Sequence, residues 1–365
     1  MDDALPAKVE LRRGWTTGTC ATAAAAAAFE ALLTGVFPEA VTLALPRGGT
    51  ATLAIASTRF DAGVATAGVI KDAGDDPDVT HGAEVRASVA PGPPGSGVTF
   101  RAGDGVGTVT LPGLPVAVGE PAINPGPRAM IRAAIAALAA RHGGTGDVVV
   151  TVSIPGGEAL AAKTLNGRLG ILGGLSILGT TGIVVPFSCA AWIHSIHRGI
   201  DVARAAGLVH LAAATGSTSE AAVKAFHGLP EAALIDMGDF VGGTLKYLRR
   251  QPVPRLTIAG GFAKLLKLAQ GAMFLHSSKS RVDMQALCRL LETLAAPKDL
   301  VAEAAGANTA AQVLAAATER GLPLADAVAE RARAMAEAAL APETDVEVMV
   351  FDRRGVLAGR ADFRG

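Results

Sequence analysis

"LVHLAAATGSTSEAAVKAFHG", residues 208–228, decides the fold of the second half of this chain. A short apolar run ends in Thr-Gly-Ser, and a helical pattern begins at once. The same order returns in "AALIDMGDFVGGTLKYLRRQ" (232–251) and in "RLTIAGGFAKLLKLAQG" (255–271). Strands that alternate with helices predict a parallel sheet with right-handed crossovers. We therefore expect residues 191–365 to form a Rossmann-like α/β domain, with two further helices and a closing hairpin at 345–361.

Residues 1–190 have a different pattern, which predicts an α+β domain. A threonine-rich turn leads into an alanine helix that should end near Leu33, with Gly35 as its stop. Residues 40–57 alternate like a β-hairpin, and residues 63–90 read as two strands around an acidic loop. A helix near 127–141, a strand over 147–157 and a helical stretch over 158–170 follow. A chain of 365 residues is long enough for these two domains.

Composition excludes several classes of protein. Lys plus Arg and Asp plus Glu both number 33, so the chain lacks the basic footprint of a nucleic-acid binder. Three cysteines without a CxxC pair favour a reducing compartment, and the acidic start is no signal peptide, so we expect a cytoplasmic protein. Residues 169–193 are uncharged, but five glycines and Pro186 favour a buried strand–loop–strand passage over a membrane span.

The strand ends of the second half are the first candidate ligand site. Ligands of open parallel sheets bind beyond the carboxyl ends of the strands. Glycine there lets backbone amides face a ligand. Asp236 and Asp239, which lie at one of these strand ends, could hold ribose hydroxyls. The alternative is that these are ordinary short loops, which favour glycine. The candidate cofactor-binding residues at these ends are Thr215, Gly216, Asp236, Gly238, Asp239, Gly260 and Gly261.

Other motifs give weaker signals. "GDGVG" (103–107) imitates a dinucleotide fingerprint, but a strand pattern follows it, and the chain has no P-loop motif. The loop "KDAGDDPDVTHG" (71–82) could bind a hard cation, could serve acid–base or substrate contacts, or could be a solvated turn. Its catalytic candidates are Asp72, Asp76 and His81. His194 and His197 share a helix face near Cys189, but this spacing is weak evidence for a metal, and we expect no protein-bound metal.

Taken together, the motifs resemble a known family. "LRRGWTTGTCATAAAAAA", "KDAGDDPDVTHG", "VSIPGGEALAAKTLNGRLGILGGLSILGTTGIV" and "HSSKSRVD" stand in the order found in the CbiD family, the cobalt-precorrin-5B (carbon-1) methyltransferases. The resemblance covers nearly the whole chain and departs from the family pattern at residues 187–201. It implies an α+β domain followed by an α/β domain. It also implies methylation of carbon 1 of cobalt-precorrin-5B by S-adenosylmethionine, giving cobalt-precorrin-6A in cobalamin biosynthesis, with cobalt present only in the substrate.

The implied chemistry suggests where each partner binds. Methyl transfer is a displacement, so the protein mainly aligns donor and acceptor. Gly179, Thr180, Thr181 and Gly182 are expected beside the donor, together with the strand ends of the second domain. Thr16, Thr17 and Thr19 would offer hydroxyls and helix amides to a substrate carboxylate, unless they serve tight helix packing alone. Cations that could hold the other carboxylates of the macrocycle are Arg12, Arg13, Lys71, Arg128, Lys163, Arg168, His276 and Lys279.

Two other functions remain open on the residues alone. One is a nucleotide-dependent oxidoreductase built on the Rossmann-like half, which the missing GxGxxG weakens. The other is a non-catalytic carrier of a tetrapyrrole or cobalt intermediate. Hand-over to neighbouring corrin-pathway enzymes and homo-oligomer formation are compatible with each of these readings.

Overall fold

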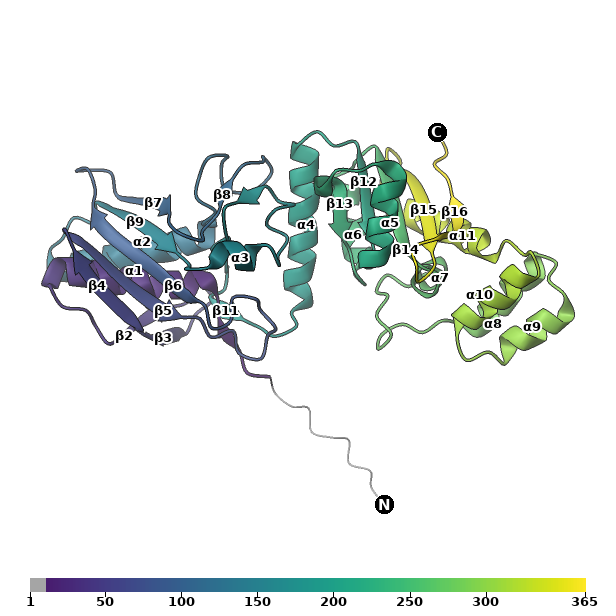
Figure 1. The fold of residues 1–365 in the computed structure, drawn as a ribbon, viewed down its shortest axis with the longest axis horizontal. Coiled ribbons are helices and arrows are strands. Elements are labelled where there is room, and N and C mark those ends of the chain that lie inside the picture. Colours follow the sequence, from purple (N-terminus) through teal and green to yellow (C-terminus); the bar gives the residue numbers. More distant parts are fainter. Residues whose placement is uncertain (1–10) are drawn as a thin grey trace, which may run out of the picture. The chain divides into compact units, whose positions relative to one another are not determined.

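The computed structural model describes residues 11–365 and divides the chain into two compact units, Met1–Ser188 and Cys189–Gly365 (Figure 1). Cysteines 20, 189 and 288 are free thiols in it. No helix within residues 11–365 is long and apolar enough to cross a membrane.

A five-stranded sheet forms the framework of the first unit. Its neighbours run antiparallel except for β7 and β9, which are parallel. Buried and half-buried residues alternate along β6 and β9, because successive side chains point to opposite faces. The acidic loop joins β5 to β6, as predicted. In spatial order the strands are β4 (Ser57–Asp61), β5 (Val64–Ile70), β6 (Glu84–Pro91), β9 (Val148–Ser153) and β7 (Val98–Ala102).

Helix α1 (Thr17–Thr34) lies on β5 and β6 and packs against α2 (Pro125–His142). It starts at Thr17, earlier than the Thr19 or Ala21 that the sequence pattern predicts, because the Thr16 side chain caps it and accepts a hydrogen bond from the Thr19 amide. Gly35 ends it in the left-handed conformation, which confirms the predicted stop. The alanines of residues 21–28 are buried on every side of the helix. Methyl side chains therefore let the sheet and α2 approach the helix backbone closely.

Short elements complete the first unit. The predicted hairpin is present as β2 (Ala40–Ala44) and β3 (Thr50–Ala54). The uncharged passage contains β10 (Ile171–Leu172), which pairs with β8 (Thr108–Val109), and β11 (Ile183–Val184), which pairs with β1 (Gly14–Trp15). The helical pattern expected after residue 157 gives only α3 (Gly157–Ala161), because turns follow at once.

The second unit is built on a sheet of four parallel strands with one antiparallel edge strand, β16, from the predicted closing hairpin. Helix α5 (Ser217–His227) packs on one face, and α4 (Cys189–Ala205), α6 (Val241–Arg250), α7 (Phe262–Ala269) and α11 (Leu324–Ala339) supply the core on the other. In spatial order the strands are β13 (Leu234–Asp236), β12 (His210–Ala214), β14 (Arg255–Gly261), β15 (Asp345–Phe351) and β16 (Leu357–Ala361).

The expectation of two helices between α7 and the closing hairpin was wrong, because four are present. Proline opens two of them, and Thr309 caps a third through a reciprocal capping box with Gln312. These breaks divide what looked like longer helical stretches. The four helices are α8 (Met284–Thr293), α9 (Lys298–Ala305), α10 (Ala310–Glu319) and α11 (Leu324–Ala339).

Candidate functional site

The carboxyl ends of β12 and β14 form a topological switch point in the second unit. The chain leaves β12 for β13 on one side and later returns to β14 on the other. Connections that depart in opposite directions leave a crevice at the strand ends, where ligands of such sheets bind. Thr215 N donates to Ala259 O at 2.9 Å, which holds the two ends together. The structure thus brings Thr215, Gly216, Gly260 and Gly261 side by side.

Two of these glycines have no steric reason to be glycine. A Cβ on Gly216 or Gly261 would meet no atom within 4 Å. Both backbones are extended, with φ of 169° and −73°, which other residues adopt readily. Gly260 differs, because its Cβ would lie 2.7 Å from Thr215 Oγ1. The open space beside Gly216 and Gly261 lies at the amino ends of α5 and α7, where helix amides favour anionic or polar ligand groups.

Lys264 is a functional candidate that our sequence reasoning missed. Its Nζ donates to Thr215 O at 2.7 Å and lies 3.1 Å from Asp239 Oδ1, while 37% of the side chain is exposed. One ammonium group therefore joins the ends of three neighbouring strands. The sequence did contain a signal: a lysine in the first turn of a helix opposes the helix dipole, so it needs a separate reason to be there.

The third strand end, after β13, is covered by α4. Trp192 Nε1 donates to Asp236 O at 3.3 Å, and a Cβ on Gly238 would lie 3.6 Å from the indole ring. Gly238 has a φ of 54°, so the turn itself requires glycine. The first turn of α4 (Cys189–Ala205) thus contributes Trp192 to this edge.

In the first unit, the predicted threonine turn and the predicted glycine segment meet. Thr17 Oγ1 donates to Leu178 O at 3.2 Å, and Thr19 Oγ1 donates to Gly182 O at 2.7 Å. The three threonines of the turn are buried. A Cβ on Gly179 would lie 2.2 Å from Thr16 Oγ1. These hydroxyls hold the glycine segment, which supports the packing alternative, and their role toward a substrate stays a prediction.

The catalytic candidates lie in the acidic loop, where each already has a partner. Arg12 binds Asp72 with both terminal nitrogens, and this contact lowers the pKa of Asp72 to about 2. His81 Nδ1 accepts a hydrogen bond from Ala73 N at 3.1 Å. Asp76 Oδ1 accepts one from Phe187 N at 2.9 Å. The loop therefore ties distant parts of the first unit together, and a catalytic role for it remains untested.

Lys71 and Asp78 form the buried part of this loop. Lys71 Nζ lies 2.6 Å from Asp78 Oδ2, and only 1% of the lysine side chain is exposed. Burial opposes ionisation of Asp78, but the Lys71 charge and the hydrogen bonds from Lys71 and Thr80 outweigh it, so its pKa is lowered. A substrate carboxylate could reach Lys71 only if this pair opened.

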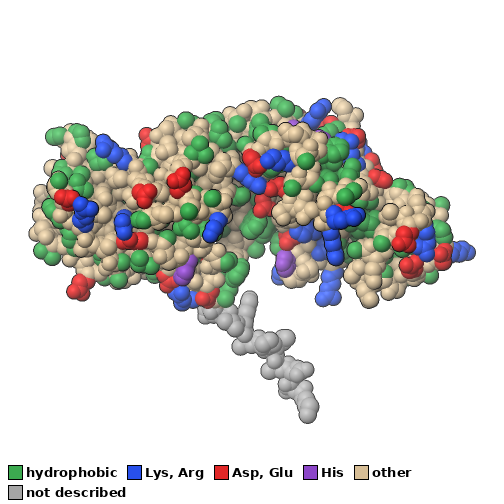
Figure 2. Space-filling model, viewed as in Figure 1, with side chains coloured by type: hydrophobic (Ala, Val, Ile, Leu, Met, Phe, Trp, Pro, Cys, Tyr) green, Lys and Arg blue, Asp and Glu red, His purple; other side chains and the backbone are tan. Residues whose placement is uncertain are grey.

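The other predicted substrate cations fall into two groups. Arg128 is turned inward, since its Nε donates to Ile123 O at 2.8 Å and its side chain is 17% exposed. Arg168 is half-buried. The candidates that are exposed to solvent are Arg13, Lys163, His276 and Lys279. Acidic and basic side chains are interspersed on the surface of each unit drawn in Figure 2.

His197 has surroundings that suit packing, whereas His194 is exposed. The His197 ring stacks on Tyr247, with centroids 3.8 Å apart and planes 12° from parallel. Burial lowers the pKa of both imidazoles. Cys189 is exposed at the start of the same helix.

The fold defines a two-unit α/β protein, and the glycine-lined edge is its candidate ligand site. A CbiD family model matches residues 5–186, and a model of the CbiD C-terminal domain matches residues 274–362. The chain belongs to the CbiD family, which confirms the resemblance found in its motifs.

Relatives with high identity span almost the whole chain. Proteins named cobalt-precorrin-5B C(1)-methyltransferase from Bradyrhizobium sp. and Paramagnetospirillum magneticum are 62% and 59% identical to it. The matches cover 97% and 96% of this chain, and 95% and 98% of those proteins. A crystal structure of the cobalamin biosynthesis protein CbiD from Archaeoglobus fulgidus is 30% identical, covering 72% of this chain and 81% of that one, with a TM-score of 0.40.

Proposed function

We propose that this protein transfers the methyl group of S-adenosylmethionine to carbon 1 of cobalt-precorrin-5B, giving cobalt-precorrin-6A in cobalamin biosynthesis. The names of its relatives support the reaction. The structural observation that carries the proposal is the pair of sterically unneeded glycines, Gly216 and Gly261, at the switch point of the second unit. Glycine there leaves room for a bulky cofactor to approach the backbone.

The donor would bind along this edge through its charged and hydroxyl groups. The amides at the starts of α5 and α7 and the Lys264 ammonium group suit the carboxylate of the methionine part. Asp236 or Asp239 would accept hydrogen bonds from the ribose hydroxyls. Asp239 Oδ1 is buried without a hydrogen bond and faces only the Lys264 charge, so it has acceptor capacity left for a ligand.

The reaction needs alignment more than an enzymic nucleophile. The electron-rich macrocycle supplies the electron pair that forms the new carbon–carbon bond. The sulfonium carbon–sulfur bond breaks, and S-adenosylhomocysteine leaves as a neutral thioether. Holding the three reacting atoms in line converts a bimolecular step into an effectively unimolecular one, which lowers the barrier by up to about 7–11 kcal/mol.

The carboxylates of the macrocycle would meet exposed cations. Arg13 and Lys163 in the first unit, and His276 and Lys279 in the second, have side chains open to solvent. Exposed cations pair with a polyanion through charge-assisted hydrogen bonds at little structural cost. Association with neighbouring pathway enzymes, self-association and a cytoplasmic location belong to the same proposal.

Incubation with methyl-labelled S-adenosylmethionine and cobalt-precorrin-5B tests the function. We expect one label per macrocycle and release of S-adenosylhomocysteine. Tight tetrapyrrole binding without transfer of label would instead support the carrier. A fluorescence change of NAD(P)H on mixing, again without transfer, would support the oxidoreductase.

A further inference from the structure

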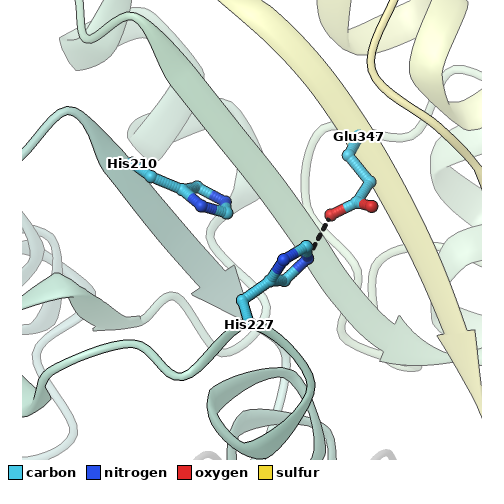
Figure 3. A group of neighbouring side chains, drawn as sticks. All are labelled: His210, His227 and Glu347. Atoms are coloured by element: carbon cyan, nitrogen blue, oxygen red, sulfur yellow. Dashed lines mark hydrogen bonds and ion pairs between the residues drawn. The ribbon is translucent and has the colours of Figure 1, made fainter.

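Two histidines and a glutamate converge at the end of the second unit's sheet opposite to the proposed donor edge. His210 starts β12, His227 ends α5 and Glu347 lies in β15, and their ligand atoms all lie within 4.8 Å of one another (Figure 3). His210 pairs in register with Arg255, the first residue of β14, which places the group at the amino ends of the strands. Within residues 11–365 it is the only such group of three.

A hydrogen-bond chain already aligns the three side chains. His227 Nε2 lies 2.7 Å from Glu347 Oε2, which also accepts the Thr257 hydroxyl at 2.6 Å. His210 Nε2 lies 2.8 Å from Thr257 Oγ1. Because the hydroxyl hydrogen points to the carboxylate, its oxygen accepts from His210. His227 Nε2 is therefore bonded to the carboxylate oxygen directly, and His210 Nε2 is linked to the same oxygen through the Thr257 hydroxyl.

We propose that His210, His227 and Glu347 bind a divalent first-row transition metal ion. Two imidazole nitrogens and one carboxylate oxygen are a ligand set typical of zinc and its neighbours, and three protein ligands leave a position for water. Ligand atoms about 2.1 Å from a tetrahedral zinc lie roughly 3.4 Å apart. The separations here, from 2.7 Å to at most 4.8 Å, bracket that value, so rotations of the two rings suffice.

The surroundings of Glu347 match the outer shell of a metal site. Its side chain is 0% exposed, and Arg360 Nε donates to its other oxygen, Oε1, at 2.6 Å. Partners of this kind fix a ligating carboxylate in place. Asp362 lies 2.8 Å from Arg360 and balances part of the guanidinium charge, which would otherwise oppose a cation. Oε2 is left to face the two imidazoles.

The ion would join three elements that are distant in sequence. It would connect the start of β12, the end of α5 and β15. The Phe363 ring lies edge-on to the His210 ring at 5.3 Å and tilted to the His227 ring at 6.3 Å, so the C-terminal residues cover the site. A bound ion should therefore stabilise the second unit.

Calorimetric titration of the chelator-treated full-length protein with Zn²⁺ tests the site. We expect one ion per chain, with affinity at least tenfold lower in His227→Gln and in His210→Gln. Glutamine at position 210 places an N–H near the position of Nε2, where it can still bond Thr257, so this variant should still fold. His142→Gln is the matched control, because His142 also lies beside a glutamate, Glu30, at 3.8 Å, but has no third ligand.

Thermal unfolding distinguishes loss of the metal site from loss of the fold. The variants should melt near the wild-type temperature in chelator, and Zn²⁺ should raise the melting temperature of the wild type and of His142→Gln but not of the two site variants. Absence of Zn²⁺ binding, or equal binding by wild type and both site variants, overturns the proposal. Loss of binding in His197→Gln with retention in His227→Gln also overturns it, because that places the ion on α4.

Discussion

Lys71 Nζ lies 2.6 Å from Asp78 Oδ2 in an environment that leaves 1% of the lysine side chain exposed. A buried ammonium group cannot keep its charge without a partner, because leaving water costs it several kcal/mol. The acidic loop that the sequence offered as a catalytic candidate therefore has at least one structural carboxylate.

Replacing Asp78 by asparagine should destabilise the protein by about 3 kcal/mol, since it leaves Lys71 buried and unpaired. Urea unfolding followed by circular dichroism would measure this. Asp61→Asn is the control, because the Arg59–Asp61 pair is exposed and should contribute less than about 1 kcal/mol. Equal effects of the two substitutions would contradict the structural role.

The Lys71–Asp78 pair also predicts that the free energy of unfolding falls at acid pH. The folded pKa of Asp78 is below its unfolded value, so its contribution is complete above about pH 4 and is lost as pH falls through the folded pKa. Unfolding midpoints measured downward from neutral pH should fall less steeply below about pH 4 in Asp78→Asn than in the wild type. Parallel profiles would show that Asp78 is not ion-paired in solution.

Alanine substitutions at the switch point should weaken ligand binding without changing the stability of the fold. Gly216→Ala and Gly261→Ala meet no atom within 4 Å and should leave the melting temperature almost unchanged. If S-adenosylhomocysteine binds at this edge, calorimetry should show at least tenfold weaker affinity in both. Gly167→Ala, which also has open space but lies in the other unit, is the control. Unchanged affinity in both edge variants would remove the donor from this edge.

Lys264→Met should weaken S-adenosylhomocysteine binding by tenfold or more, because it removes a cation suited to the amino-acid carboxylate. Binding of 5′-methylthioadenosine, which has no carboxylate, should change little. This comparison distinguishes a direct role from damage to the loop. Equal loss for both ligands would indicate that Lys264 acts only by holding Thr215 O and Asp239.

Gly14→Ala should destabilise the first unit by about 3 kcal/mol, since its Cβ would lie 2.1 Å from the backbone carbon of Ala73. A contact with backbone cannot be relieved by rotating a side chain. Chemical denaturation against Gly167→Ala, in the same unit, measures the difference. A stability equal to that control would show that the two backbone segments are further apart in solution.

Local patterns were sufficient to predict much of the fold. The strand–helix pair β12 and α5 was predictable because an apolar run, a glycine and a helical period follow one another within the 21 residues 208–228. The four helices between α7 and β15 were predicted as two, because α9, α10 and α11 are rich in alanine and only short turns separate them. Their boundaries depend on Pro297, Thr309 and Pro323, whose caps are clear only in the structure.

The candidate sites were harder to predict than the fold. Glycines at strand ends are visible in the sequence, whereas the signal for Lys264 is only its unfavourable place in the first turn of α7. His210, His227 and Glu347 are brought together only by the parallel pairing of β12, β14 and β15. Contacts between residues more than 100 positions apart carry no local pattern, so only the folded chain shows them.

The alanine helix α1 also fixes the spacing between layers. Because methyl groups lie on every side of α1, the helix holds the sheet of the first unit and α2 at a short distance from its own backbone. A larger side chain in place of any alanine within residues 21–28 would widen this spacing and displace both neighbours. This part of the chain should therefore tolerate very little drift in size, whatever the chemistry of the residue that replaces alanine.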